Sequence, residues 1–318
     1  MRLKRSSEGA RALLVQRIDS VLRSVVDSPS PSASSELRAI VGRLGELFVR
    51  DQDRLIGVQQ LLASSHALAE RALHSAAVAK LLAVAEGLSA DAQASIVAAA
   101  LTADVAIIEG HDRLATHAGL LVDSQRQMIA THPEAAARWL RSVGVDDPLW
   151  LSAVEMHHER LDGSGYPLGL SAESIPIGPR IVALADTFTA MLRPRADRPA
   201  FLARDALREL AGAEASRFDT RLAHVLARQL GAYPPGTLVK LANGEVGVCV
   251  RRTHDARKPV LRAVVDSSGQ PYASPKRRDP ADSASKIVEV LHPDRHRGVC
   301  GLVNRLWKKS LNLVGDRS

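Results

Sequence analysis

Apolar residues recur at helical spacing from about residue 64 to residue 230, and this pattern constrains the fold more than any other feature. The segment is rich in Ala and Leu, and Gly87, Gly144 and Gly231 follow expected helix ends, while Asp91 and Asp123 lie near helix starts. We therefore expect a mainly α fold built on one large helical domain. Its expected helices are 64–87, 90–108, 123–143, 147–159, 178–192, 203–212 and 219–231.

Two further helices are expected before this domain. Residues 8–26 and 36–63 carry apolar residues at helical spacing, and they are separated by DSPSPSASS, a Pro/Ser-rich stretch that breaks helices. Residues 1–63 are therefore predicted to form an N-terminal helical region.

The pattern changes after the YPPGT stretch at 233–237. The sequence LVKLANGEVGVCVRR predicts two short strands joined at Asn243-Gly244, which is a strong hairpin signal. KPVLRAVVDSSG and KIVEVLH add further strand candidates, so a small antiparallel β module is expected at 235–292. With the helical domain at 64–232, the chain would then end in a basic tail at 293–318, in which only GLVNRLWKKSLNLV is suited to an amphipathic helix.

Composition is that of a folded protein, with 46% hydrophobic and 24% charged residues. The most apolar stretch, IVAAALTADVAII, contains Asp104, and the first residues form no continuous apolar run, so we expect neither a transmembrane segment nor a secretory signal. Cys249 and Cys300 have no paired spacing and fit a reduced compartment. These features predict a cytoplasmic protein.

The net charge of +7 comes from the C-terminal quarter, where 16 Lys and Arg stand against 8 Asp and Glu from Pro235 onward. Such an excess attracts nucleic acid, anionic lipid or an acidic partner, or it forms a solvated surface. Because aromatic residues make up only 3% of the chain and offer no stacking platform, a solvated surface is favoured and nucleic-acid binding is not expected.

The stretch HHERLDGSGYP, residues 157–167, places two adjacent imidazoles and two carboxylates ahead of a Gly-Ser-Gly turn. Glu70 and His74 lie four residues apart on one helix face, where they are able to share a cation, although such a pair is common by chance. His132 precedes a proline near a helix start, where a capping or surface role is the ordinary interpretation.

Asp104 and Asp186 each interrupt an apolar helix. A buried carboxylate needs a cation or strong hydrogen-bond donors, so each aspartate is either a metal ligand or an exposed residue.

HHERLDGSGYPLGL, followed by IPIGPRIVALADTFTAM, resembles the signature of the HD-GYP family, a branch of the HD metal-dependent phosphohydrolases. Upstream, RALHSAAVAKLLAVAEGLS and ATHPEAAARWL resemble the helices that carry other ligands of that family. The resemblance covers roughly residues 64–230. It implies a helical bundle that holds two or three iron or manganese ions and hydrolyses cyclic di-GMP in bacterial signalling.

The resemblance also implies roles for individual residues. Asp104, His157 and His158 would be catalytic, with Asp104 bridging two ions. The substrate loop would use Gly163, Gly165, Tyr166, Pro167 and Arg180, the last as a phosphate contact or in a surface ion pair. The implied metal ligands are Glu70, His74, Asp104, His132, His157, His158 and Asp186.

The sequence departs from the family pattern around Asp104. Ala103 holds the place of the family's His, and Ala106 and Ile107 hold those of its Gly and Lys, so one ligand and one cation are missing. A shifted alignment onto His111 and Asp112 is not favoured, because their context is a polar, Gly-containing loop. His117 is a possible substitute ligand.

Two functions follow. The first is a metal-dependent phosphodiesterase acting on cyclic di-GMP. The second is an inactive HD-GYP module that binds nucleotide, or a protein partner through the GYP loop or the β module.

Overall fold

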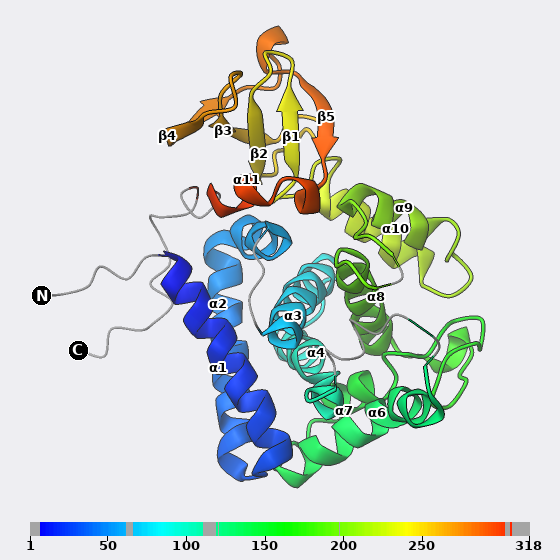
Figure 1. Ribbon diagram of the computed structural model, residues 1–318. Coiled ribbons are helices and arrows are strands. Elements are labelled where there is room, and N and C mark those ends of the chain that lie inside the picture. Colours follow the sequence, from blue (N-terminus) through cyan, green and yellow to red (C-terminus); the bar gives the residue numbers. More distant parts are fainter. Residues whose placement is uncertain are drawn as a thin grey trace, which may run out of the picture. The chain divides into compact units, whose positions relative to one another are not determined.

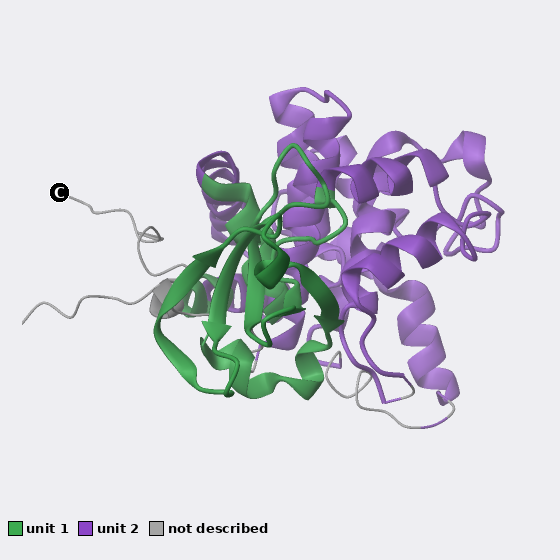
Figure 2. Ribbon diagram, turned by 90° about the horizontal axis from the view of Figure 1, so that it is seen from above, with its two compact units in different colours: residues 1–16, 51–64, 230–318 green, residues 17–50, 65–229 purple. Residues whose placement is uncertain are grey.

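The structure is a computed structural model of the 318-residue chain and describes residues 7–61, 66–110, 119, 121–196, 198–302 and 306 (Figure 1). His111, Asp112 and His117 lie outside the described residues, as does most of the tail beyond residue 302. The chain divides into two compact units, one of residues 1–16, 51–64 and 230–318 and the other of residues 17–50 and 65–229 (Figure 2). The division into four regions expected from the sequence stays a prediction.

The two N-terminal helices are α1 (Ser7–Asp27) and α2 (Pro31–Leu61). The break between them is shorter than expected, because α2 begins at Pro31 inside the Pro/Ser-rich stretch. Proline is tolerated in the first turn of a helix, where its missing N–H has no partner to lose. Asp51, with φ −162° and ψ 77°, interrupts α2.

The second unit is helical, which confirms the mainly α fold class. It also contains the 3₁₀ turns η1 (Val105–Ile107) and η2 (Ala172–Ser174). Large side chains such as Trp150 and Phe188 are fully buried in its core. Its helices after α2 are α3 (Ala67–Ala85), α4 (Ala90–Thr102), α6 (Asp123–Ser142), α7 (Pro148–Glu155), α8 (Ile177–Met191), α9 (Ala203–Ala211) and α10 (Thr220–Leu230).

The helix expected over 90–108 ends early. Regular α4 stops at Thr102, and Asp104 takes non-helical angles, φ −99° and ψ 12°, as the residue before η1. Aspartate favours helix ends because its side chain competes for hydrogen bonds in non-helical conformations. Asp104 therefore lies outside the regular part of α4.

Asp147 fixes the start of α7. Its Oδ1 accepts hydrogen bonds from the backbone N–H groups of Leu149 and Trp150, each at 3.0 Å, and Ser95 on α4 donates to its Oδ2 at 2.6 Å. Trp150 in turn donates from Nε1 to Thr102 Oγ1 at 2.8 Å. These contacts tie α7 to α4, so the residues that follow the two helices are held at a fixed separation.

The other unit contains a five-stranded antiparallel sheet in the order β4-β3-β2-β1-β5, which confirms that a small antiparallel β module follows the helices. Gly244 lies in the β1–β2 turn with φ +87°, as the Asn-Gly signal requires. The core of this unit includes Val58 and Leu61 of α2, and α11 (Arg297–Leu302) buries Cys300 there. The strands are β1 (Leu238–Leu241), β2 (Val246–Arg251), β3 (Val260–Val265), β4 (Pro271–Arg278) and β5 (Ile287–Leu291).

Glu245 is the main buried charge beside this sheet, with 4% of its surface exposed. Arg278 donates to both carboxylate oxygens at 2.6 Å, and Tyr272 and Asn243 donate at 2.5 and 3.0 Å. These donors lower the pKa of Glu245 to about 2, with the Arg278 hydrogen bonds as the largest cause. The carboxylate therefore joins β4 to the β1–β2 turn.

Among the described residues, one segment, Ala90–Ile107, is long and apolar enough to cross a membrane, and 67% of it is buried inside the protein. A core helix has the same properties, so this is weak support for a membrane span.

Candidate metal centre

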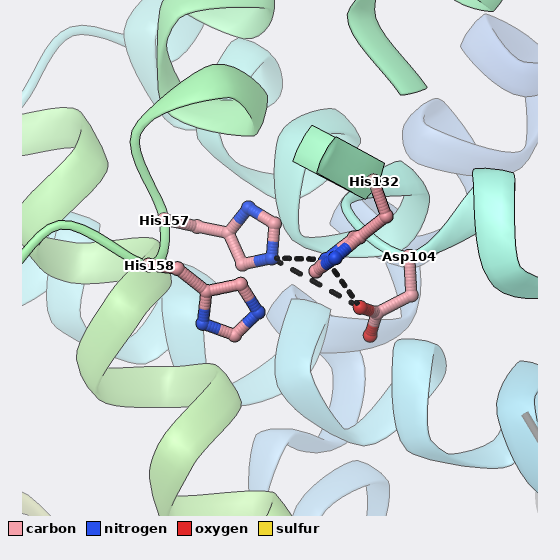
Figure 3. A group of neighbouring side chains, drawn as sticks. All are labelled: Asp104, His132, His157 and His158. Atoms are coloured by element: carbon pink, nitrogen blue, oxygen red, sulfur yellow. Dashed lines mark hydrogen bonds and ion pairs between the residues drawn. The ribbon is translucent and has the colours of Figure 1, made fainter. Parts of the chain in front are cut away.

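Four side chains bring their ligand atoms together in the helical unit. Asp104, His132, His157 and His158 each offer one atom, and these atoms lie within 4.8 Å of one another (Figure 3). Asp104 comes from the break after α4, His132 from the middle of α6, and the two adjacent histidines from the turn after α7. Three distant parts of the sequence therefore converge on one point.

Backbone carbonyls fix the orientation of two of the imidazoles. Nδ1 of His132 lies 2.7 Å from the carbonyl oxygen of Ile129, and Nδ1 of His157 lies 2.6 Å from that of Val154. A carbonyl only accepts hydrogen bonds, so each Nδ1 carries the proton and each Nε2 presents a lone pair.

These lone pairs face one another. The Nε2 atoms of His132 and His157 are 3.3 Å apart, and Oδ1 of Asp104 lies 3.3 Å from the first and 3.9 Å from the second. Three acceptors that converge without a proton between them repel one another, and a cation among them removes the repulsion. The donor set therefore fits a metal ion.

The protonation states agree with this interpretation. Burial lowers the pKa of His132 to about 4, and burial with the neighbouring imidazoles lowers the pKa values of His157 and His158 well below the ordinary value. The rings are neutral near pH 7, which is the form that binds metal.

The other three predicted ligands are buried but do not join this cluster in the described part of the chain. Glu70 and His74 lie on α3 with 0% and 1% of their surfaces exposed, and Asp186 lies on α8 with 7% exposed. Nη2 of Arg71 contacts Asp104 Oδ2 and lies 3.2 Å from Asp186 Oδ1, while Nη1 of Arg193 lies 3.7 Å from Glu70 Oε2.

Sequence reasoning did not single out these two arginines. The available signal was a basic residue at position 71, next to Glu70 on a helix whose other residues are mostly apolar and buried. A cation on a helix that is otherwise mostly buried is a reason to expect an ion pair.

The predicted substrate loop packs directly on the second histidine of the pair. The Tyr166 ring stacks on the His158 ring with centroids 4.7 Å apart and planes at 26°, and the Tyr166 N–H donates to the His158 carbonyl at 3.2 Å. Pro167 follows through a cis peptide bond. Burial raises the pKa of Tyr166, so its hydroxyl keeps its proton.

Glu159 and the glycines shape this loop. The Glu159 carboxylate accepts from the backbone N–H groups of Leu168 at 2.6 Å and Leu170 at 2.8 Å. A Cβ on Gly165 would overlap the backbone of residues 159 and 160, so only glycine fits there, and Gly163 has φ +78°.

Arg180 lies away from the four-residue cluster in its contacts. Its Nε donates to the carbonyl of Ile175 at 2.7 Å, one terminal nitrogen donates to the carbonyl of Ala172, and the other lies 3.2 Å from Asp219 Oδ2. These contacts anchor the segment after the loop to α8. The predicted phosphate contact stays a prediction, as do the roles of the other site residues.

Comparison with known proteins shows the family to which this chain belongs. The model of the HD domain family matches residues 57–222. A solved structure of an HDG"Y"P protein from Bdellovibrio bacteriovorus superposes with a TM-score of 0.59, covering 70% of this chain and 70% of that chain at 12% identity. At that identity the likeness concerns the fold.

Three curated relatives share the sequence more closely. A cyclic di-GMP phosphodiesterase of Pseudomonas aeruginosa is 30% identical to this chain, and the matched part covers 48% of this chain and 37% of the relative. The cyclic di-GMP phosphodiesterase response regulator RpfG of Xanthomonas campestris is 31% identical over 65% of this chain and 55% of its own length. A 3′3′-cGAMP-specific phosphodiesterase of Vibrio cholerae is 32% identical over 38% of this chain and 29% of its own length.

Proposed function

Because this chain belongs to the HD domain family, as the HD-GYP-like motifs indicated, we propose that it is a metal-dependent phosphodiesterase that hydrolyses cyclic di-GMP. The proposal concerns the helical unit, since the chain spans only about a third to a half of the first two curated relatives. Cytoplasmic signalling is part of the proposal, and so is a protein partner at the GYP loop or the β module.

One observation carries the proposal: His132, His157 and Asp104 aim three acceptor atoms at one another without a proton between them. Imidazole and carboxylate ligands suit iron or manganese better than metals that prefer thiolates. A bound ion would supply Lewis acidity to the phosphoryl oxygens and lower the pKa of an attacking water.

The chain's own residues prepare the site for this chemistry. The carbonyls of Ile129 and Val154 hold the His132 and His157 rings in the tautomer that binds metal. Tyr166 lies over His158 at the edge of the centre, where its protonated hydroxyl is a donor suited to a phosphate oxygen. Glu159 fixes the backbone that carries Tyr166.

The test is hydrolysis by anaerobically purified full-length chain supplied with Fe(II) or Mn(II). We expect turnover of cyclic di-GMP above that of 3′3′-cGAMP, and loss of at least about 100-fold in His158→Ala. The control is His224→Ala, because His224 is exposed on α10. Equal turnover by wild type and His158→Ala, or none with either metal, would contradict the proposal.

A second function is favoured by the surroundings of Asp104. Ala103 and Ile107 replace the His and Lys that the resemblance leads one to expect, and Arg71 already pairs with Asp104. An inactive module would bind cyclic di-GMP without cleaving it. Saturable binding by calorimetry, together with an unchanged nucleotide after prolonged incubation with either metal, would favour this function over the first.

A further inference from the structure

The two oxygens of the Asp104 carboxylate have different partners. Oδ1 faces the histidines, 3.3 Å from His132 Nε2 and 3.9 Å from His157 Nε2. Oδ2 is in contact with Nη2 of Arg71. A carboxylate that bridges two metal ions through both of its oxygens uses one oxygen for each ion, so the guanidinium holds the oxygen that a second ion bound in this way would need.

Asp186 shares the same guanidinium. Its Oδ1 lies 3.2 Å from Arg71 Nη2, so one nitrogen lies between carboxylates from α8 and from the end of α4. Only 10% of each carboxylate side chain and 15% of the Arg71 side chain are exposed. Two poorly solvated carboxylates repel each other unless a cation lies between them, and arginine stays charged when buried.

The local charges also favour a single metal ion over two. Glu70, Asp104 and Asp186 carry three negative charges, and Arg71 and Arg193 return two positive charges through contacts with them. One divalent ion leaves these groups with a net charge of +1, and two ions leave +3. A larger net charge is costly to bury, so the described residues favour a single ion.

We infer that the Arg71 guanidinium occupies the place of a second metal ion, and that this chain binds one ion on the histidine side of Asp104. The inference rests on the proposed function only in that the site binds metal at all. Ala103 is consistent with it, because a chain that has dispensed with one ion has no need of the missing imidazole. Arg71 is then a positioning residue that holds Asp104 Oδ1 toward His132.

The experiment measures metal content per chain by mass spectrometry after anaerobic loading of the full chain with Fe(II) or Mn(II) and removal of excess metal. We expect about one ion in wild type and in Arg71→Lys, which keeps the charge, and about two in Arg71→Ala. Arg221→Ala is the matched control, because it removes a bidentate ion pair with Glu86 in the same unit. It should keep one ion.

A crystal of loaded wild-type protein adds a readout that needs no variant. Anomalous scattering should show one peak among Asp104, His132, His157 and His158 and none between Asp104 and Asp186. Two ions in wild type would overturn this inference and leave the proposed function standing. One ion in both wild type and Arg71→Ala would overturn the role of the guanidinium, and no ion in wild type would overturn both proposals.

Discussion

Nε2 of His132 lies 3.3 Å from Nε2 of His157, while the Nδ1 atom of each ring is directed at a backbone carbonyl. Each carbonyl enforces the tautomer that leaves a lone pair on Nε2, so the backbone of α6 and α7 dictates the chemistry at the centre. In the absence of a cation this arrangement is repulsive, and metal binding should therefore stabilise the folded chain.

The first prediction concerns this coupling. Adding Mn(II) at about 100 times its dissociation constant should stabilise wild type by about 2.7 kcal/mol, because the ion binds the folded state. His157→Ala should lose most of that increment, since it removes one of the converging acceptors. The measurement is the metal-induced change in the unfolding midpoint, which separates lost binding from lost packing.

His224→Ala is the control for the first prediction, because that side chain is exposed on α10. It should retain the full metal-induced increase. An increase of equal size in His157→Ala would show that His157 is not a ligand.

The second prediction concerns the loop that carries Tyr166. Gly165→Ala should destabilise the chain by about 1–3 kcal/mol, because its methyl group would overlap the backbone of residues 159 and 160. Gly42→Ala is the matched control, since α2 leaves open space there and alanine favours a helix by about 1 kcal/mol. Urea unfolding should move the two variants in opposite directions, and a neutral Gly165→Ala would contradict the close approach.

Much of the fold could be read from the sequence because its patterns are local. Helical spacing and capping residues predict the helices of the second unit, and Asn243-Gly244 predicts the β1–β2 hairpin. The start of α2 was misplaced because Pro31 was interpreted as a helix breaker, although in the first turn it costs nothing.

The candidate site was predictable where the motif names single residues, and less so where tertiary contacts decide. The double histidine, His132 and Asp104 converge as the resemblance implies. The pairing of Arg71 with both Asp104 and Asp186 depends on how α3, α4 and α8 pack, and no spacing in the sequence encodes it. Residue-by-residue comparison with a motif shows which family residue is missing, such as the His at the position of Ala103. It does not show which other side chain contacts the remaining residues of the site, as Arg71 contacts Asp104.

The third prediction separates positioning from substrate contact at Arg180. The guanidinium donates to the carbonyls of Ile175 and Ala172 and pairs with Asp219. Arg180→Ala leaves these acceptors unsatisfied and should cost about 1–3 kcal/mol of folding free energy. If the side chain acts only in this way, KM for cyclic di-GMP at a temperature where the variant is folded should stay within about twofold of wild type.

A tenfold rise in KM for Arg180→Ala, with an unchanged unfolding midpoint, would instead assign this arginine to the substrate. Arg180→Lys adds a check, because lysine keeps the charge but is unable to reproduce three divergent contacts. A structural role predicts that Arg180→Lys remains destabilised.

The last prediction is a pH dependence in the β-sheet unit. The donors around Glu245 lower its pKa to about 2 from an ordinary 4.5, so the folded state favours the carboxylate. The stability that this preference contributes is fully present above pH 4.5 and is lost as the pH falls toward 2, where the folded state also becomes protonated. The shift corresponds to ~3 kcal/mol, which solvent screening of the partly exposed Arg278 reduces to ~2 kcal/mol.

Glu245→Gln should therefore be less stable than wild type at pH 7, and the difference should shrink steadily below pH 4.5 in urea unfolding followed at several pH values. Glu289→Gln is the control, because Glu289 is exposed on β5 and its loss should change stability little at any pH. A constant difference between Glu245→Gln and wild type from pH 7 to pH 2 would mean that the amide disrupts packing and that the charge of Glu245 contributes nothing.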